Sequence, residues 1–267
     1  PTEVQDLIAN LLGVSAANVT VEVRRMGGAF GGKETQAAHF AILAALGAHV
    51  TGRPVKVRLD RDDDMRVTGK RHDFLVNYRV GHDAKGLITA ADIELNSRCG
   101  WSSDLSRSVN DRALFHAENA YFIPSVKIVS NRFKTNTVSN TAFRGFGGPQ
   151  GMIGIERCMD VIARVTGKDP LDIRLLNLYG TSGTETPYGM SIDEGVLPKI
   201  IRNLAETSDY RNRREEINLT NDQSKRIKRG IALTPVKFGI SFTASFLNQA
   251  GALLNVYKDG SVSLNHG

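Results

Sequence analysis

Apolar and polar residues alternate along this chain with two different periods, and the changes of period mark the expected elements. Apolar positions that recur every three or four residues indicate helices, and strict alternation indicates half-buried strands. The helical period predicts helices over 4–13, 36–50, 111–119, 150–166, 171–178 and 192–207. The two-residue period predicts strands over 19–25, 55–59, 74–80, 87–96, 126–131 and 133–136, and a new set of strands from 230.

The order of these elements predicts the fold class. Helices and strands follow one another irregularly, which favours an α+β fold with mixed sheets. At the end of the chain, apolar alternation flanks Asp259-Gly260, a dipeptide typical of the type I′ hairpin turn. We expect a loop over 102–110 and a linker over the charged stretch 209–229. We therefore place a first lobe in residues 1–225 and the start of a second lobe in 226–267, and expect both lobes to be incomplete.

The composition is typical of a globular protein in water. A hydrophobic content of 41% and a charged content of 23% exclude a disordered or fibrous chain, and the net charge of +6 is a modest basic excess. No apolar run is long enough to span a membrane, and the first residues lack the pattern of a signal peptide. Acidic residues are interleaved with the basic residues of 209–229, which favours a solvated surface over a nucleic-acid-binding patch. Two cysteines far apart, Cys99 and Cys158, favour a reducing cytoplasm.

Two glycine-rich segments, GGAFGGKE (27–34) and AFRGFGGPQG (142–151), each precede a predicted helix. Glycine lets the backbone approach a ligand closely, and a helix N-terminus offers unpaired N–H groups. The pair of segments predicts an oxygen-rich or anionic ligand that backbone amides hold. The alternative is that both are tight turns packed against a sheet. Neither segment has the spacing of a phosphate loop or of a dinucleotide-binding turn.

Four longer motifs carry a resemblance to a known family. In order along the chain, RRMGGAFGGKET (24–35), NDRALFHAENAY (110–121), NTAFRGFGGPQG (140–151) and KFGISFTASFLNQAGA (237–252) resemble the molybdenum-binding portion of the xanthine dehydrogenase and xanthine oxidase family. The resemblance implies molybdopterin in this portion, and [2Fe–2S] clusters and FAD on other segments or subunits. It also implies NAD or oxygen as the electron acceptor and a dimer of the whole enzyme.

The same resemblance assigns roles to individual residues. Cofactor-binding residues would be Phe30, Gly31 and Arg144. Catalytic residues that face the substrate would be Glu34 and Arg112. Further substrate-binding residues would be Phe146, Phe242, Thr243 and Ser108, with the two phenylalanines on either side of a flat ring. The general base of the family would lie beyond the end of this chain.

The implied chemistry accounts for these residue types. By resemblance, a molybdenum-bound hydroxide attacks an electron-poor ring carbon while a hydride passes to a sulfido ligand. Negative charge then builds on the ring, where Arg112 would stabilise it as a permanent cation. Glu34 would hydrogen-bond to ring nitrogens or an exocyclic oxygen. A carboxylate with a guanidinium favours oxopurines, so we expect oxidation of hypoxanthine to xanthine and of xanthine to urate.

Other interpretations stay open. Glu34 and Arg112 could form an ion pair at a helix start. Within the enzyme class, the rival is a hydroxylase of aldehydes or of another N-heterocycle such as nicotinate. Outside it, the chain could be a catalytically silent fragment or scaffold subunit that lacks the general base. A nucleic-acid-binding module would rest on the charge of +6 alone.

Overall fold

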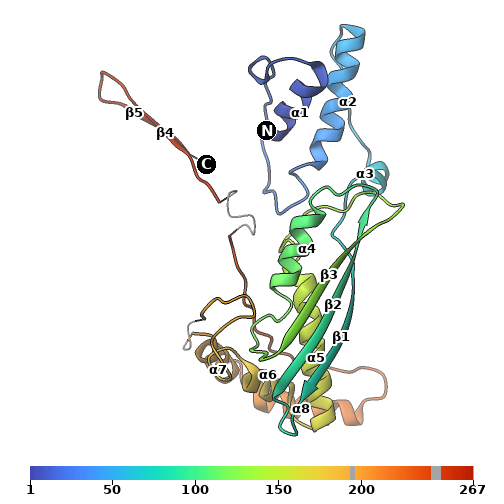
Figure 1. Cartoon of the computed structure of the whole chain (residues 1–267), viewed down its shortest axis with the longest axis vertical. Coiled ribbons are helices and arrows are strands. Elements are labelled where there is room, and N and C mark those ends of the chain that lie inside the picture. Colours follow the sequence, from blue (N-terminus) through green and yellow to red (C-terminus); the bar gives the residue numbers. More distant parts are fainter. Residues whose placement is uncertain (193–195, 242–247, 267) are drawn as a thin grey trace. The chain divides into compact units, whose positions relative to one another are not determined.

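The computed structural model describes residues 1–192, 196–241 and 248–266, and the chain divides into two compact units (Figure 1). The first unit is Pro1–Lys237 and the second is Phe238–Gly267. Helices and mixed sheets occur together, which confirms the predicted α+β class. The predicted lobe boundary after residue 225 stays a prediction.

A three-stranded sheet organises the first unit. Its strands are β1 (Phe74–His82), β2 (Ile88–Gly100) and β3 (Val126–Lys134), in the order β1-β2-β3. The first pair is antiparallel, whereas β2 and β3 are parallel. Parallel neighbours need a crossover connection, and α4 (Ser106–Phe115) provides it. The long helix α5 (Gly148–Thr166) packs against both α4 and β1 (Figure 1).

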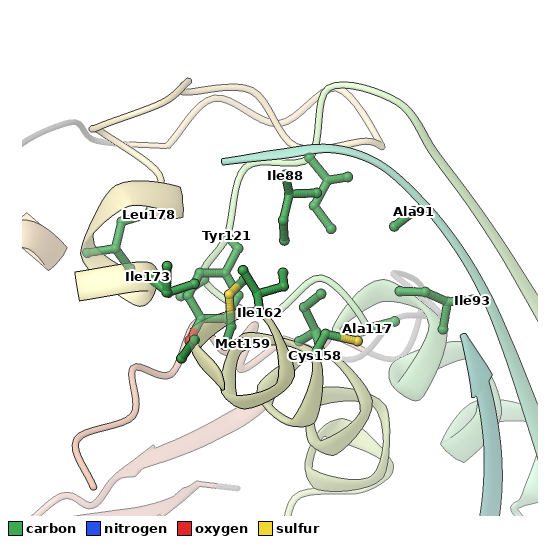
Figure 2. Packing of buried hydrophobic residues seen from close by; sticks show 14 of the residues in the cluster. Ile88, Ala91, Ile93, Ala117, Tyr121, Cys158, Met159, Ile162, Ile173 and Leu178 are labelled. Carbon is green, nitrogen blue, oxygen red and sulfur yellow. The ribbon is translucent and has the colours of Figure 1, made fainter. Parts of the chain in front are cut away.

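The hydrophobic core lies between β2 and α5 (Figure 2). Alternate residues of β2, including Ile93 and Leu95, are fully buried, as the two-residue period predicts. On α5 the buried residues recur at helical spacing and include Met159 and Ile162. Tyr121 contributes an aromatic ring to this core, and its hydroxyl donates to Glu156 Oε1 over 2.6 Å. The core therefore fixes the position of α5 against the sheet.

The remaining helices surround this core or extend from it. In the first unit they are α1 (Thr2–Leu12), α2 (Gln36–Thr51), α3 (Arg61–Val67), α6 (Pro170–Asn177), α7 (Val196–Thr207) and α8 (Tyr210–Gln223), with a short 3-10 turn at Ala16–Asn18. The second unit contains the antiparallel strands β4 (Ala252–Val256) and β5 (Val262–His266). None of the described helices is both long and apolar enough to cross a membrane.

Several local predictions are wrong. The expected loop 102–110 contains the first half of α4. The stretch 209–229 contains α8, and its role as a linker between lobes stays a prediction. Apolar and polar residues alternate over 19–25 and 55–59, which predicts strands. In the described structure neither segment is a strand or pairs with one. Strand β3 is continuous to Lys134 rather than divided at 132.

The predicted type I′ turn is also wrong. Such a turn needs positive φ at both central residues. Of Asp259 and Gly260, only Gly260 has a positive φ, of 83°. The N–H of Tyr257 donates to Ser261 O over 2.9 Å, and the N–H of Gly260 donates to Tyr257 O over 3.0 Å. The connection is therefore longer, with a single left-handed glycine.

Candidate cofactor and substrate site

The two glycine-rich segments are in direct backbone contact. Gly31 has a φ of 78°, and a Cβ atom there would lie 2.7 Å from Phe143 Cα and 2.8 Å from Ala142 O. Such distances exclude any side chain, so only glycine permits this approach. The structure thus brings together the two segments that the sequence analysis singled out. It places Phe30 and Gly31 beside the residues that precede Arg144.

Glycine also brings α4 against the start of α5. A Cβ atom on Gly147 would lie 2.0 Å from Val109 O, and one on Gly151 would lie 2.2 Å from Ala113 O. These two glycines make the packing of α5 against α4 close, whereas the alternative of tight turns expects packing against a sheet. The consequence for the site is that α4, which carries Ser108 and Arg112, lies next to the segment with Phe146.

We expect Gly147→Ala to lower the free energy of unfolding by about 2–3 kcal/mol, because it adds overpacking to a strained backbone conformation. The φ of Gly147 is 101°. Gly167→Ala is the matched control, because Gly167 has a φ of 68° but no atom within 4 Å of the added Cβ. We expect Gly167→Ala to lower the free energy of unfolding by about 1 kcal/mol. Urea unfolding of both variants measures the difference, and equal losses would contradict the packing role of Gly147.

Two phenylalanines of the site have unusual backbone conformations. Phe30 has a φ of 50° and Phe146 a φ of 51°, both in the left-handed region that bulky residues rarely adopt. Phe30 is exposed, and the guanidinium carbon of Arg144 lies 5.8 Å from its ring centroid. The N–H of Phe146 donates to Phe143 O over 2.7 Å. Strained residues of this kind cluster at ligand sites.

Arg112 and Ser108 lie one turn apart on α4. Arg112 is only 4% exposed, and this burial lowers its pKa from the ordinary value. An arginine nevertheless stays protonated in proteins, so the helix presents a buried cation. His116 lies a further turn along, and its Nδ1 donates to Arg112 O over 2.8 Å. Burial lowers the pKa of His116, and the positive charges of Arg112 and Lys237 lower it further.

Glu34 is exposed, and its Oε2 accepts from the N–H of Lys33 over 3.1 Å. Among the described residues it makes no ion pair, so the expected alternative of a Glu34–Arg112 pair is not observed. Close to Glu34, the buried Gln36 donates to Asp104 Oδ2 over 3.2 Å. This hydrogen bond ties the start of α2 to the turn before α4. Phe242 and Thr243 lie outside the described residues.

A buried polar cluster, which no pattern along the sequence predicts, lies at the end of α4. The Lys237 ammonium pairs with the Glu118 carboxylate, whose side chain is 1% exposed, and donates to Tyr188 Oη over 2.9 Å. The N–H of Lys237 donates to Asn119 Oδ1 over 3.1 Å, and Asn119 Nδ2 donates to Pro235 O over 2.9 Å. We call Glu118, Asn119 and Lys237 the 118–237 clamp. Its members belong to two of the quoted motifs, but spacing along the chain does not reveal that they meet.

Two stretches of the chain match known protein families. Residues 1–178 and residues 203–267 match two families that are both described as molybdopterin cofactor-binding domain. The whole chain is 48% identical to xanthine dehydrogenase of Drosophila subobscura. It is 46% identical over 266 residues to xanthine dehydrogenase/oxidase of Felis catus. In both comparisons all of this chain is covered but only 20% of the relative, so the chain spans about one fifth of the length of the curated relatives it matches.

Solved structures show the same fold. An aldehyde oxidoreductase from Desulfovibrio gigas superimposes with a TM-score of 0.70 and 23% identity, over 97% of this chain and 28% of that one. Reconstituted CO dehydrogenase from Oligotropha carboxidovorans gives a TM-score of 0.71 and 21% identity, over 85% of this chain and 29% of that one. At these identities the likeness concerns the fold alone.

Proposed function

Because the chain belongs to the molybdopterin cofactor-binding domain family, we propose that it forms part of the cofactor and substrate site of a purine-oxidising molybdenum hydroxylase. The reactions are the oxidation of hypoxanthine to xanthine and of xanthine to urate. Identity of 46–48% to xanthine dehydrogenases over the chain supports this substrate class. The single observation that carries the proposal is the buried Arg112 on a helix packed against the segment of Phe146.

The residues at the junction of the glycine-rich segments fit a large anionic cofactor. The close backbone contact at Gly31 leaves no room for a side chain, and the buried Thr141 Oγ1 has no hydrogen-bond partner among the described atoms. Backbone amides of Phe30 and Gly31 and the exposed guanidinium of Arg144 would hold the cofactor. When bound, molybdopterin supplies the two-electron oxidation and the oxygen transfer to the substrate ring.

The chain's own residues then bind and orient the purine. Phe146 would contact one face of the ring, and Phe242 would contact it from a second direction. Such a contact fixes the orientation of the ring and lowers the entropic part of the barrier. Arg112 is held rigidly on α4, so its charge needs no reorganisation when negative charge develops on the ring. Glu34 would accept a hydrogen bond from a ring N–H, with Ser108 and Thr243 as polar neighbours.

Partners and location follow from the same proposal. Electrons would leave through [2Fe–2S] clusters and FAD on other segments or subunits, with NAD as the acceptor. The rest of the molybdenum-binding portion would complete the site, and the whole enzyme would be a dimer in the cytoplasm. The buried, free cysteines Cys99 and Cys158 suit a reducing compartment.

Turnover of xanthine against benzaldehyde by the complete native protein tests the proposal. We expect kcat/KM for xanthine to exceed that for benzaldehyde by about 100-fold or more, because a site that is built to hydrogen-bond a substrate rejects one that lacks those groups. Preference for benzaldehyde would overturn the roles of Glu34 and Arg112 and favour an aldehyde hydroxylase. Turnover of nicotinate alone would indicate another N-heterocycle. No turnover of any of them by molybdenum-loaded protein would favour the catalytically silent scaffold.

A further inference from the structure

A pocket that the proposed function does not use lies where β2 and β3 end. Its volume is about 350 Å³, within the range of small-molecule sites. Trp101 and Ser103, which follow β2, line it together with Arg107 of α4 and with Arg132 and Lys134 of β3. Arg107 is exposed and Arg112 is buried, so the two arginines of α4 lie on different faces of that helix.

The position of this pocket in the fold is one that binds ligands. Strands β2 and β3 are parallel neighbours, and Gly100 at the end of one pairs with Lys134 at the end of the other. The crossover helix α4 begins at the same edge, directly after β2 (Figure 1). In open α/β sheets, ligands bind outside the carboxyl ends of the parallel strands, and a helix N-terminus there favours negative charge. The parallel pair β2 and β3 with its crossover helix repeats this local arrangement.

The charges around the pocket are not balanced. Arg107 lies in the first turn of α4, where a cation opposes the helix dipole, and that turn contains no acidic residue. Within the described part of the chain, neither Arg107 nor Lys134 forms an ion pair. Arg132 lies 3.9 Å from Asp111, and both side chains are nearly half exposed, so this pair is weak. The nearby Asp104 already accepts from Gln36.

Trp101 offers an aromatic surface beside these cations. Trp101 is 63% exposed, although most of the surface of a tryptophan is usually buried. Its backbone is fixed, because its N–H donates to Thr137 O over 3.0 Å. The preceding Gly100 O accepts from the N–H of Thr135 over 3.0 Å. No other ring stacks on the indole among the described residues.

We propose that this pocket binds a small planar anion of mononucleotide size. The ring of the ligand stacks on Trp101, and its acidic group lies between Arg107 and Lys134, with Ser103 as a further donor. Aromatic stacking and charge-assisted hydrogen bonds each provide part of the affinity. The pocket therefore distinguishes this ligand from an uncharged nucleoside, which lacks the acidic group, and from a free phosphate, which lacks the ring. This inference does not depend on the proposed reaction.

Fluorescence of the full chain tests the proposal with AMP as the probe. Trp101 is the only tryptophan of the sequence, but it lines both this pocket and a neighbouring pocket of about 560 Å³ beside α2 and α3. The substitutions below therefore decide which pocket the signal reports on. We expect AMP to change the emission in a saturable way. We expect adenosine and inorganic phosphate each to bind at least about tenfold more weakly than AMP. Rising salt weakens AMP binding, because the site is exposed. Absence of a saturable signal with AMP at millimolar concentration would overturn the proposal.

Substitutions with a matched control complete the test, with binding measured by calorimetry. We expect Lys134→Gln and Arg107→Gln each to weaken AMP binding about tenfold, the loss of one charge-assisted contact. Lys127→Gln is the control, because Lys127 is an exposed lysine on the same strand that does not line the pocket. Equal losses in Lys134→Gln and Lys127→Gln would indicate general charge attraction and contradict a defined site. Loss of AMP binding in Arg112→Met with folding retained would place the ligand in the substrate site instead.

Discussion

Replacement of Arg112 by methionine is expected to lower kcat/KM for xanthine by about two orders of magnitude or more, with a much smaller loss of stability. Removing one preorganised charge donor from a transition state costs about 3 kcal/mol, and each 1.4 kcal/mol is a factor of about ten in rate. Arg112 is held in place by the packing of α4 against α5, so its charge is preorganised. Methionine keeps much of the buried apolar stem, so the fold is retained.

The measurement is steady-state turnover together with thermal unfolding and bound molybdenum content. Arg107→Met is the matched control, because it removes an arginine from the same helix at an exposed position. We expect that variant to keep turnover within about twofold, since an exposed charge outside the site adds little to the reaction. If turnover by Arg112→Met falls only as far as the fraction of folded protein falls, Arg112 has a structural role only.

Replacement of Lys237 by methionine is expected to lower the free energy of unfolding by about 3–5 kcal/mol, because it leaves a buried carboxylate without its partner. The Glu118 side chain is 1% exposed, and Lys237 is the cation that pairs with it. Burial raises the pKa of Glu118, and the charge of Lys237 opposes that rise. Loss of Lys237 therefore raises the pKa of Glu118 further.

The pH dependence of this variant has a definite sign. A carboxyl group with a higher pKa in the folded state holds its proton in the fold at a pH where the unfolded chain has lost it. Stability then falls as the pH rises from the ordinary carboxyl pKa to the raised one. The defect of Lys237→Met should therefore be smaller at about pH 5 than at about pH 8. Urea unfolding at both values measures it.

Two further variants separate the clamp from general effects. The double variant Glu118→Gln with Lys237→Met should recover part of the loss, because no charge then stays buried without a partner. Arg79→Met breaks the exposed Arg79–Asp92 pair of β1 and β2 and should cost less than about 1 kcal/mol. Lys237→Met could instead lose as little free energy of unfolding as Arg79→Met, with the same loss at both pH values. That result would contradict a stabilising role of the buried Glu118–Lys237 pair.

The elements that the sequence predicts best are those whose own pattern decides their structure. Helix α5 and strand β2 occur close to the predicted residues, because each buries one regular face in the core. The pattern fails where tertiary contacts decide. Helix α4 has little apolar periodicity, and it is fixed by glycines of another segment. Helix α8 resembles a charged linker, yet the Tyr210 hydroxyl donates to Asp169 Oδ1 over 3.1 Å and holds that helix to the unit.

The candidate site divides in the same way. Local sequence predicts both glycine-rich segments, the helices that follow them and the family, since motifs are runs of neighbouring residues. Only the tertiary structure brings Gly31 against Ala142 and joins Lys237 to Glu118. It also shows that Gly147 serves helix packing, a role that its motif does not reveal. The physical reason is that close backbone contacts and buried ion pairs depend on which distant segments pack together. One pattern of residues along the chain is compatible with many such tertiary contacts.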